Sequence, residues 1–66
     1  MNLIINGETK IFEDGHTLQY IIKSLEIEDK VMAAAVNMEI VKKDKWDQYN
    51  PCDNDKIELL QFVGGG

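Results

Sequence analysis

The sequence predicts an α+β fold in which one main helix packs across a mixed sheet of about four to five strands. Two observations support this prediction. Short apolar stretches with strand character lie on both sides of a single stretch with helical periodicity, and no segment after residue 30 repeats that periodicity. At 66 residues the chain is near the lower size limit at which a hydrophobic core holds a fold without disulfides or metals. A deep catalytic cleft is therefore not expected.

The first two strands are expected over residues 2–6 and 9–12, joined by a tight turn. The turn sequence is Asn6-Gly7, which follows the apolar run Leu3-Ile4-Ile5. Asn-Gly is the strongest short hairpin signal, because both residues accept the positive φ that a type I′ turn requires.

A turn over residues 13–16 leads into the helix, and Thr17 is expected to be its N-cap, because a hydroxyl there accepts a bond from a free backbone N–H. The helix is predicted from four apolar residues spaced at i, i+3, i+4 and i+7, which form one stripe. These residues are Leu18, Ile21, Ile22 and Leu25. The stripe is expected to bury against the sheet.

Three further strands are expected in the second half of the chain. Met32 to Val36 is an apolar run between the helix and a turn, and residues 37–39 turn into a short strand at Ile40-Val41. Residues 42–54 are the least regular stretch. They hold a basic cluster, formed by Lys42, Lys43 and Lys45, and Pro51, which breaks regular structure. The last strand is expected over Lys56 to Val63. Because strand side chains alternate, one face carries Ile57, Leu59, Gln61 and Val63, and the other carries Glu58, Leu60 and Phe62.

Composition narrows the class of protein. Hydrophobic residues at 44% and charged residues at 29% are typical of a globular domain. The net charge of −5, from 12 acidic and 7 basic residues, disfavours nucleic acid and anionic membrane surfaces as partners. The single cysteine, Cys52, cannot form an internal disulfide, and no stretch has the length of a signal peptide core or a membrane span. A cytoplasmic protein is expected.

The sequence ends in Val63-Gly64-Gly65-Gly66. We expect a domain over residues 1–63 and a flexible glycine tail over residues 64–66. Glycine presents almost no bulk, so such a tail can thread a narrow channel, and its carboxylate can attack the α-phosphate of a nucleoside triphosphate in a partner's active site. The alternative is a frayed end without a function.

Motifs along the whole chain carry a resemblance to a known family. In order they are Ile5-Asn6-Gly7-Glu8, Thr17-Leu18, Ala33-Ala34-Ala35-Val36-Asn37, Trp46, Asp55-Lys56-Ile57-Glu58 and Gly65-Gly66. Their order and spacing resemble the small sulfur carrier proteins of bacterial thiamine biosynthesis, the ThiS type. The chain departs from that pattern at Val41-Lys42-Lys43, where the family often has Val-Pro-Arg, at Asn54-Asp55 in place of Gly-Asp, and at Gly64.

The resemblance implies a β-grasp (ubiquitin-like) fold, in which the last strand pairs in parallel beside the first. It also implies a carrier cycle. An adenylating enzyme resembling ubiquitin-activating enzymes uses ATP to activate the carboxylate of Gly66, and sulfur from a cysteine desulfurase or another donor replaces AMP to form a thiocarboxylate. Thiazole synthase then takes the sulfur. In this cycle Gly64 and Gly65 belong to the tail, and the carrier needs no cofactor, metal or catalytic residue of its own.

Other residues carry weaker expectations. Leu60 and Phe62 can form an exposed apolar patch that docks a partner, or they can pack as an ordinary second sheet face. Cys52 is interpreted as incidental to sulfur transfer, because Pro51 and Asp53 beside it do not lower a thiol pKa. His16 is expected in an exposed turn, and Trp46 as a packing residue. Two alternative functions stay open, namely the small subunit of molybdopterin synthase and a ubiquitin-like modifier or interaction domain.

Overall fold

The computed structural model describes residues 1–62. The elements along the chain are β1 (Asn2–Ile5), β2 (Glu8–Ile11), α1 (Leu18–Ser24), the 3₁₀ helix η1 (Glu28–Lys30), β3 (Val31–Val36), β4 (Glu39–Val41), the 3₁₀ helix η2 (Lys43–Gln48) and β5 (Lys56–Gln61). Among these residues no helix is long and apolar enough to cross a membrane. The expectations for Val63, Gly64, Gly65 and Gly66 lie outside the described residues.

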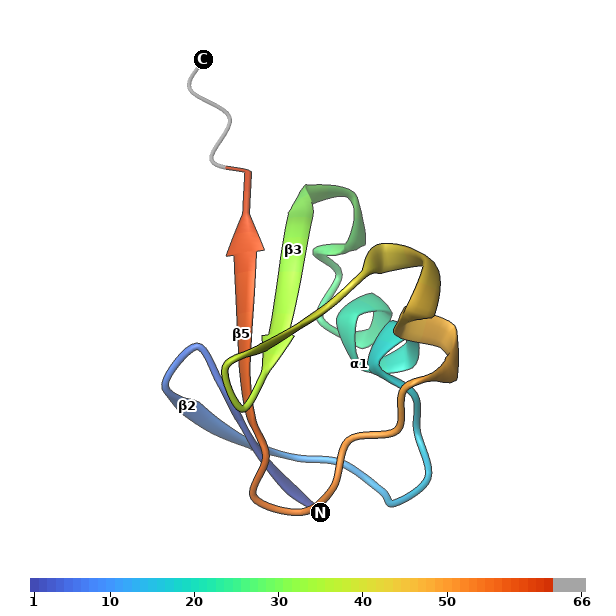
Figure 1. Ribbon diagram of the computed structural model, residues 1–66. Helices are drawn as coiled ribbons and strands as arrows, with labels where there is room; N and C mark the ends of the chain where they lie inside the picture. The colour runs from blue at the N-terminus through green and yellow to red at the C-terminus, as the bar shows by residue number, and fades with distance from the viewer. Residues whose placement is uncertain (63–66) are drawn as a thin grey trace.

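The five strands form one mixed sheet in the order β2-β1-β5-β3-β4. β5 runs parallel to β1 on one side and antiparallel to β3 on the other, while the remaining pairs are antiparallel. The helix α1 covers one face of this sheet, and β5 rises through its middle (Figure 1). The predicted α+β fold with a central parallel pair and one main helix is therefore confirmed.

The local signals in the first third of the chain act as expected. Asn6 and Gly7 have φ values of 49° and 84°, which are the two positive values of a type I′ turn. The Oγ1 of Thr17 accepts a 3.1 Å hydrogen bond from the backbone N–H of Tyr20 and so caps α1. The helix ends at Ser24, and Leu25 is its half-buried C-cap rather than part of its last turn.

The hydrophobic core lies between α1, η2 and the covered face of the sheet. Its largest fully buried side chains are Trp46, Leu3, Leu18, Ile21, Ile22 and Ile57. Trp46 is confirmed as a packing residue, since none of its surface is exposed and its Nε1–H donates a 2.9 Å bond to the backbone oxygen of Val41. η2 therefore closes the core on the side opposite the β1–β2 hairpin (Figure 1), although residues 43–48 have no apolar periodicity that predicts a helix.

Three expectations need correction. The last strand is expected to reach Val63, but β5 ends at Gln61, because the first residue of its partner β3, Val31, lies opposite Gln61. β4 begins at Glu39 rather than at residue 40. His16 does not stand in solvent as a free turn residue. It is half-buried, and its ring stacks on that of Tyr20 at 3.8 Å between centroids.

Candidate functional site

The end of β5 is where the domain leads into its last four residues, so the site is built around this strand. Ile57 and Leu59 are 0% and 6% exposed, whereas Leu60 and Phe62 are 61% and 60% exposed. The predicted alternation of the two faces is thus confirmed for the described residues. Leu60 and Phe62 lie open to solvent rather than packed on a second layer.

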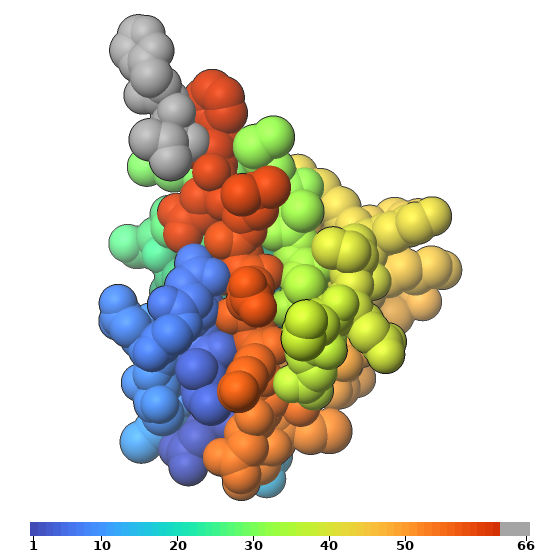
Figure 2. Space-filling model, turned by 60° about the vertical axis from the view of Figure 1, so that its left-hand side comes forward, coloured from blue at the N-terminus to red at the C-terminus, as the bar shows by residue number. Residues whose placement is uncertain are grey.

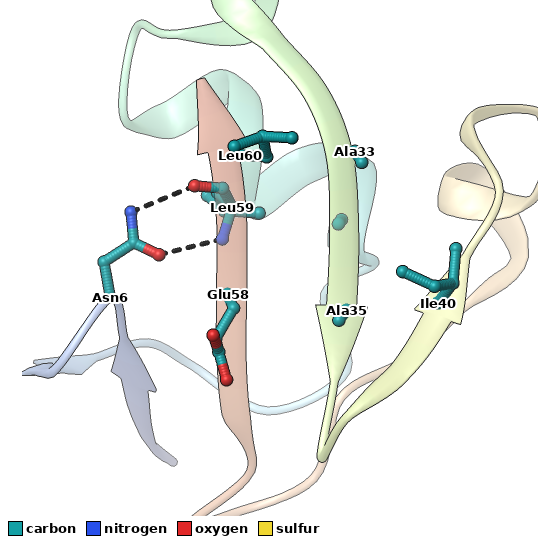
Figure 3. Close-up of a pocket in the computed structure, with 8 residues that line it drawn as sticks. Asn6, Ala33, Ala35, Ile40, Glu58, Leu59 and Leu60 are labelled. Carbon is teal, nitrogen blue, oxygen red and sulfur yellow. Dashed lines mark hydrogen bonds between the residues drawn. The ribbon is translucent and has the colours of Figure 1, made fainter. Parts of the chain in front are cut away.

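Asn6 holds β5 in place beyond the end of β1. Its side-chain Nδ2 donates to the backbone oxygen of Leu59 at 3.3 Å, and its Oδ1 accepts from the backbone N–H of Leu59 at 2.8 Å (Figure 3). The main-chain pairing of the two strands covers only Ile4 with Lys56 and Ile5 with Ile57. The Asn6 side chain therefore substitutes for one further residue of β1.

A shallow hollow of about 250 Å³ lies on the open face of the sheet over β3 and β5. Ala33 and Ala35 leave room between the side chains of Leu60 on one side and Ile40 on the other (Figure 3). We call Ala33, Ala35, Ile40 and Leu60 the sheet-face patch. Figure 2 shows this region, with β5 in orange to red between the blue hairpin and the green to yellow β3 and β4.

Sequence reasoning found Leu60 but did not place the other three residues of the patch on this face. Ile40, which is 70% exposed, was expected only as part of a short strand. The run of three alanines was a usable signal, because small residues allow a close approach, but the sequence did not tell which of them face outward. In the structure Ala34 is buried at 1% exposure, while Ala33 and Ala35 line the hollow.

Glu58 is the charged residue that borders the patch among the described residues, and it lines the hollow beside Leu60. The exposed basic cluster lies farther along the chain, where the ammonium of Lys43 lies 5.7 Å from the centre of the Trp46 ring. Burial raises the pKa of the Tyr49 hydroxyl above its usual value, and electrostatic interactions with Asp55, Cys52 and Glu39 raise it further.

The described residues offer little else that resembles a reaction centre. Within residues 1–62 no group of three or more His, Cys, Asp or Glu side chains is placed to hold a metal ion. Cys52 is exposed and has a free thiol, and its backbone N–H donates to Asp55 Oδ2 at 2.8 Å. The acidic residues Glu28 and Asp29 belong to η1. The Glu28 carboxylate accepts a hydrogen bond from the side chain of Gln19 and lies 4.0 Å from the ammonium of Lys23.

One main helix packed on a mixed sheet with a central parallel pair defines the class of ubiquitin-like β-grasp proteins. The ThiS family model matches residues 3–66, and the chain belongs to the ThiS family. It is a ThiS-type sulfur carrier of thiamine biosynthesis. This assignment favours the thiamine hypothesis over the alternative of a molybdopterin synthase small subunit.

Individual relatives agree with this assignment. The chain is 37% identical over 65 residues to the sulfur carrier protein ThiS of Bacillus subtilis, covering 97% of this chain and 98% of that protein. It is 29% identical over 66 residues to ThiS of Escherichia coli, with 100% of each covered. The crystal structure of the thiamine biosynthesis protein ThiS of Geobacter metallireducens superposes with a TM-score of 0.79 at 26% identity, with 100% of each chain covered.

A fourth similarity is of another kind. The chain is 36% identical over 66 residues to a thiazole synthase of Paramagnetospirillum magneticum, and the match covers 100% of this chain. It spans only 20% of the length of that protein. A segment similar to this carrier therefore occurs within a chain named as a thiazole synthase.

Proposed function

We propose that this chain is a protein co-substrate whose terminal carboxylate, on Gly66, carries sulfur as a thiocarboxylate for thiazole formation. The observation that carries the proposal is the match of the ThiS family model through residue 66, together with the terminal Gly65-Gly66. Gly64 is a spacer in this scheme. The carrier supplies no catalytic group and no cofactor, because ATP and the catalytic residues belong to the adenylating partner.

The chemistry follows from the reactivity of a carboxylate. A terminal carboxyl group, with a pKa of about 3.3–3.7, is ionised at neutral pH, so its oxygen can attack the α-phosphorus of ATP and release pyrophosphate. The resulting acyl-adenylate has AMP as a good leaving group. The outer sulfur of a persulfide on the donor, such as a cysteine desulfurase, attacks the acyl carbon, and AMP leaves, which gives an acyl disulfide between the carrier and the donor's cysteine. A second thiol then attacks the donor's sulfur, so that the S–S bond breaks, the thiocarboxylate is released and a disulfide forms between that thiol and the donor's cysteine.

Two partners are part of the proposal. The similarity to a segment of a thiazole synthase supports that enzyme as the acceptor of the sulfur. The sheet-face patch, extended by Phe62, supports docking of the adenylating enzyme, because an exposed apolar patch on a small domain is a usual mark of a protein interface. A cytoplasmic location, expected from the single cysteine, remains a prediction.

Intact-mass spectrometry with fragment mapping tests this function. The carrier is incubated with the adenylating enzyme, ATP and a sulfur source, and sulfur in place of oxygen is expected at Gly66 and absent without ATP. Oxidation of Cys52 or a methionine adds nearly the same nominal mass, so the Cys52→Ser variant is run beside the parent and the fragments are mapped. An unmodified Gly66 beside a demonstrably active partner would leave a ubiquitin-like binding domain as the better assignment.

A further inference from the structure

Gln61 lies on β5 beyond the end of β1. Its main-chain N–H and C=O face the side of β5 that β1 occupies farther down the strand. On that side, the backbone oxygens of Asp55 and Ile57 accept from the N–H groups of Ile4 and Asn6, at 3.0 and 2.9 Å. Leu59 follows with its two bonds to the Asn6 side chain. The odd-numbered residues of β5 therefore direct their N–H and C=O groups toward β1.

The even-numbered residues point the other way. Leu60 is opposite Ala33 in the antiparallel ladder, and the N–H of Phe62 donates to the backbone oxygen of Lys30 at 2.6 Å. Because main-chain groups alternate between the two sides of a strand, the N–H and C=O of Gln61 point to the β1 side. Asn6 already marks the end of the hairpin there, and Figures 1 and 2 show β5 extending past the hairpin turn.

Within residues 1–62, no backbone hydrogen bond reaches Gln61 from the β1 side. One residue of a central strand is thus an open edge, directly before the last residues of the chain. An unpaired strand edge is a template for another extended chain.

A second hollow lies against this open edge. It has a volume of about 220 Å³, and Ile5, Leu25 and Ile27 supply its apolar wall. Glu8 and Lys10 from β2 complete it, with 3.9 Å between the ammonium of Lys10 and the carboxylate of Glu8. Its volume is below the roughly 300–1,000 Å³ of pockets that hold drug-sized ligands, so it suits a single side chain of a peptide better than a small molecule.

We propose that the adenylating enzyme adds an extended segment of its own chain beside β5, pairing its main chain with the N–H and C=O of Gln61 and placing one side chain in the hollow of Ile5, Leu25 and Ile27. This inference rests on the proposed function. Gly66 follows Gln61 by five residues, a reach of at most about 17 Å. An enzyme that holds Gly66 in its active site therefore has its own surface beside Gln61.

The strand geometry gives this contact two sides. Because successive side chains of a strand point to opposite faces, the residue next to the one in the hollow faces the same side as Leu60. The added strand would thus contact the hollow with one side chain and the border of the sheet-face patch with the next. The main-chain bonds fix its register, and the side chains select the partner.

Hydrogen exchange of individual amides, followed by NMR, tests the proposal directly. In the free carrier the Gln61 amide is expected to exchange fast, whereas the Leu60 amide, paired with β3, exchanges slowly. On binding the adenylating enzyme, the Gln61 amide should slow by at least tenfold. A Gln61 amide that is already protected in the free carrier would show that its own chain covers the edge and would overturn the proposal.

Variants at Gln61 separate main-chain from side-chain recognition. Gln61→Pro removes an N–H that no described residue uses, so the fold should survive, but the affinity for the adenylating enzyme should fall about tenfold or more. Gln61 also lines the hollow, so the matched variant Gln61→Ala, which keeps the N–H, measures the side-chain contribution alone and should lower the affinity less than Gln61→Pro does. An ester in place of the amide at Gln61, made by chemical synthesis, gives the same test without the ring of proline.

The outcomes distinguish this inference from the function on which it rests. Normal sulfur loading and binding, with an unchanged Gln61 amide and full affinity of the ester, would overturn strand pairing and leave the carrier function intact. Failure of the parent to bind the adenylating enzyme and to load sulfur would overturn both.

Discussion

The Asn6 side chain and the Leu59 main chain are joined by two hydrogen bonds that copy the pairing of one strand residue with another. Asn6 also provides the first positive φ of the hairpin turn, at 49°. Asn6 thus forms the turn between β1 and β2, and its side chain extends the pairing of β1 with β5 by one residue.

Replacing Asn6 with glycine tests the contact without disturbing the turn. Glycine accepts the positive φ, so the loss comes from the two side-chain bonds, and we expect the free energy of unfolding to fall by about 1–3 kcal/mol. Urea unfolding followed by circular dichroism measures this change.

Asn54→Gly is the matched control for that experiment. Asn54 also has a positive φ, of 70°, but its side-chain Nδ2 bonds only the exposed carboxylate of Asp53, at 3.3 Å. We expect a change within about 0.5 kcal/mol. Equal effects of the two substitutions would show that the turn, and not the pairing with Leu59, is what Asn6 provides.

The parts of the fold that could be predicted are those set by local rules. The Asn6-Gly7 turn, the cap at Thr17 and the alternation along β5 each depend on residues close together in the sequence. The family's motifs added the strand order and the function. They did so because the motifs are spread along the whole chain and not because any of them is specific alone.

The parts that could not be predicted depend on residues far apart in the sequence. η2 has no apolar repeat, since Trp46 is its one buried residue, and its place is fixed by packing on α1. The hydrogen bonds between the Asn6 side chain and Leu59 could not be predicted either, because the side chain of a turn residue can equally point to solvent. The outward direction of Ala33 and Ala35 is set by the bulge between Val31 and Ala33, which no residue type announces.

Trp46 is expected to be the most sensitive core position in η2. Trp46→Phe leaves the backbone oxygen of Val41 without the indole donor and opens a small void, so the free energy of unfolding should fall by about 1–3 kcal/mol. Unfolding is again followed by circular dichroism, since the variant lacks the indole. Ile11→Ala, at a side chain that is 81% exposed, is the control and should change stability by less than about 0.5 kcal/mol.

Phe62→Ala is expected to weaken binding of the adenylating enzyme while the fold stays intact. The side chain is 60% exposed, so its loss removes little burial from the domain, but a central aromatic contact of an interface is worth about 1–2 kcal/mol, or about five- to thirtyfold in affinity. Calorimetric titration measures the affinity, and Leu60→Ala tests the patch beside it. Ile11→Ala removes an apolar side chain of β2 that is more exposed, at 81%, and an effect as large as that of Phe62→Ala would argue against a specific docking surface.

Cys52→Ser should leave sulfur loading at Gly66 unchanged. Cys52 is exposed, and the bond that organises its turn comes from its backbone N–H, which serine retains. Thiocarboxylate formation per ATP consumed, followed by mass spectrometry, is the measurement. A carrier that can no longer be loaded after this substitution would place Cys52 in the transfer of sulfur.

Tyr49 is expected to make stability depend on pH in the alkaline range. Its pKa is raised in the folded state, first by burial and then by the charges of Asp55, Cys52 and Glu39, whereas in the unfolded chain it is about 10. Between these two values the folded state holds the proton and the unfolded state does not. The stabilisation is therefore complete below pH 10 and is lost as the pH rises from there through the folded-state pKa. Urea unfolding at intervals from pH 8 to pH 12 should show a steeper alkaline loss in the parent than in Tyr49→Phe, and identical pH profiles would contradict the raised pKa.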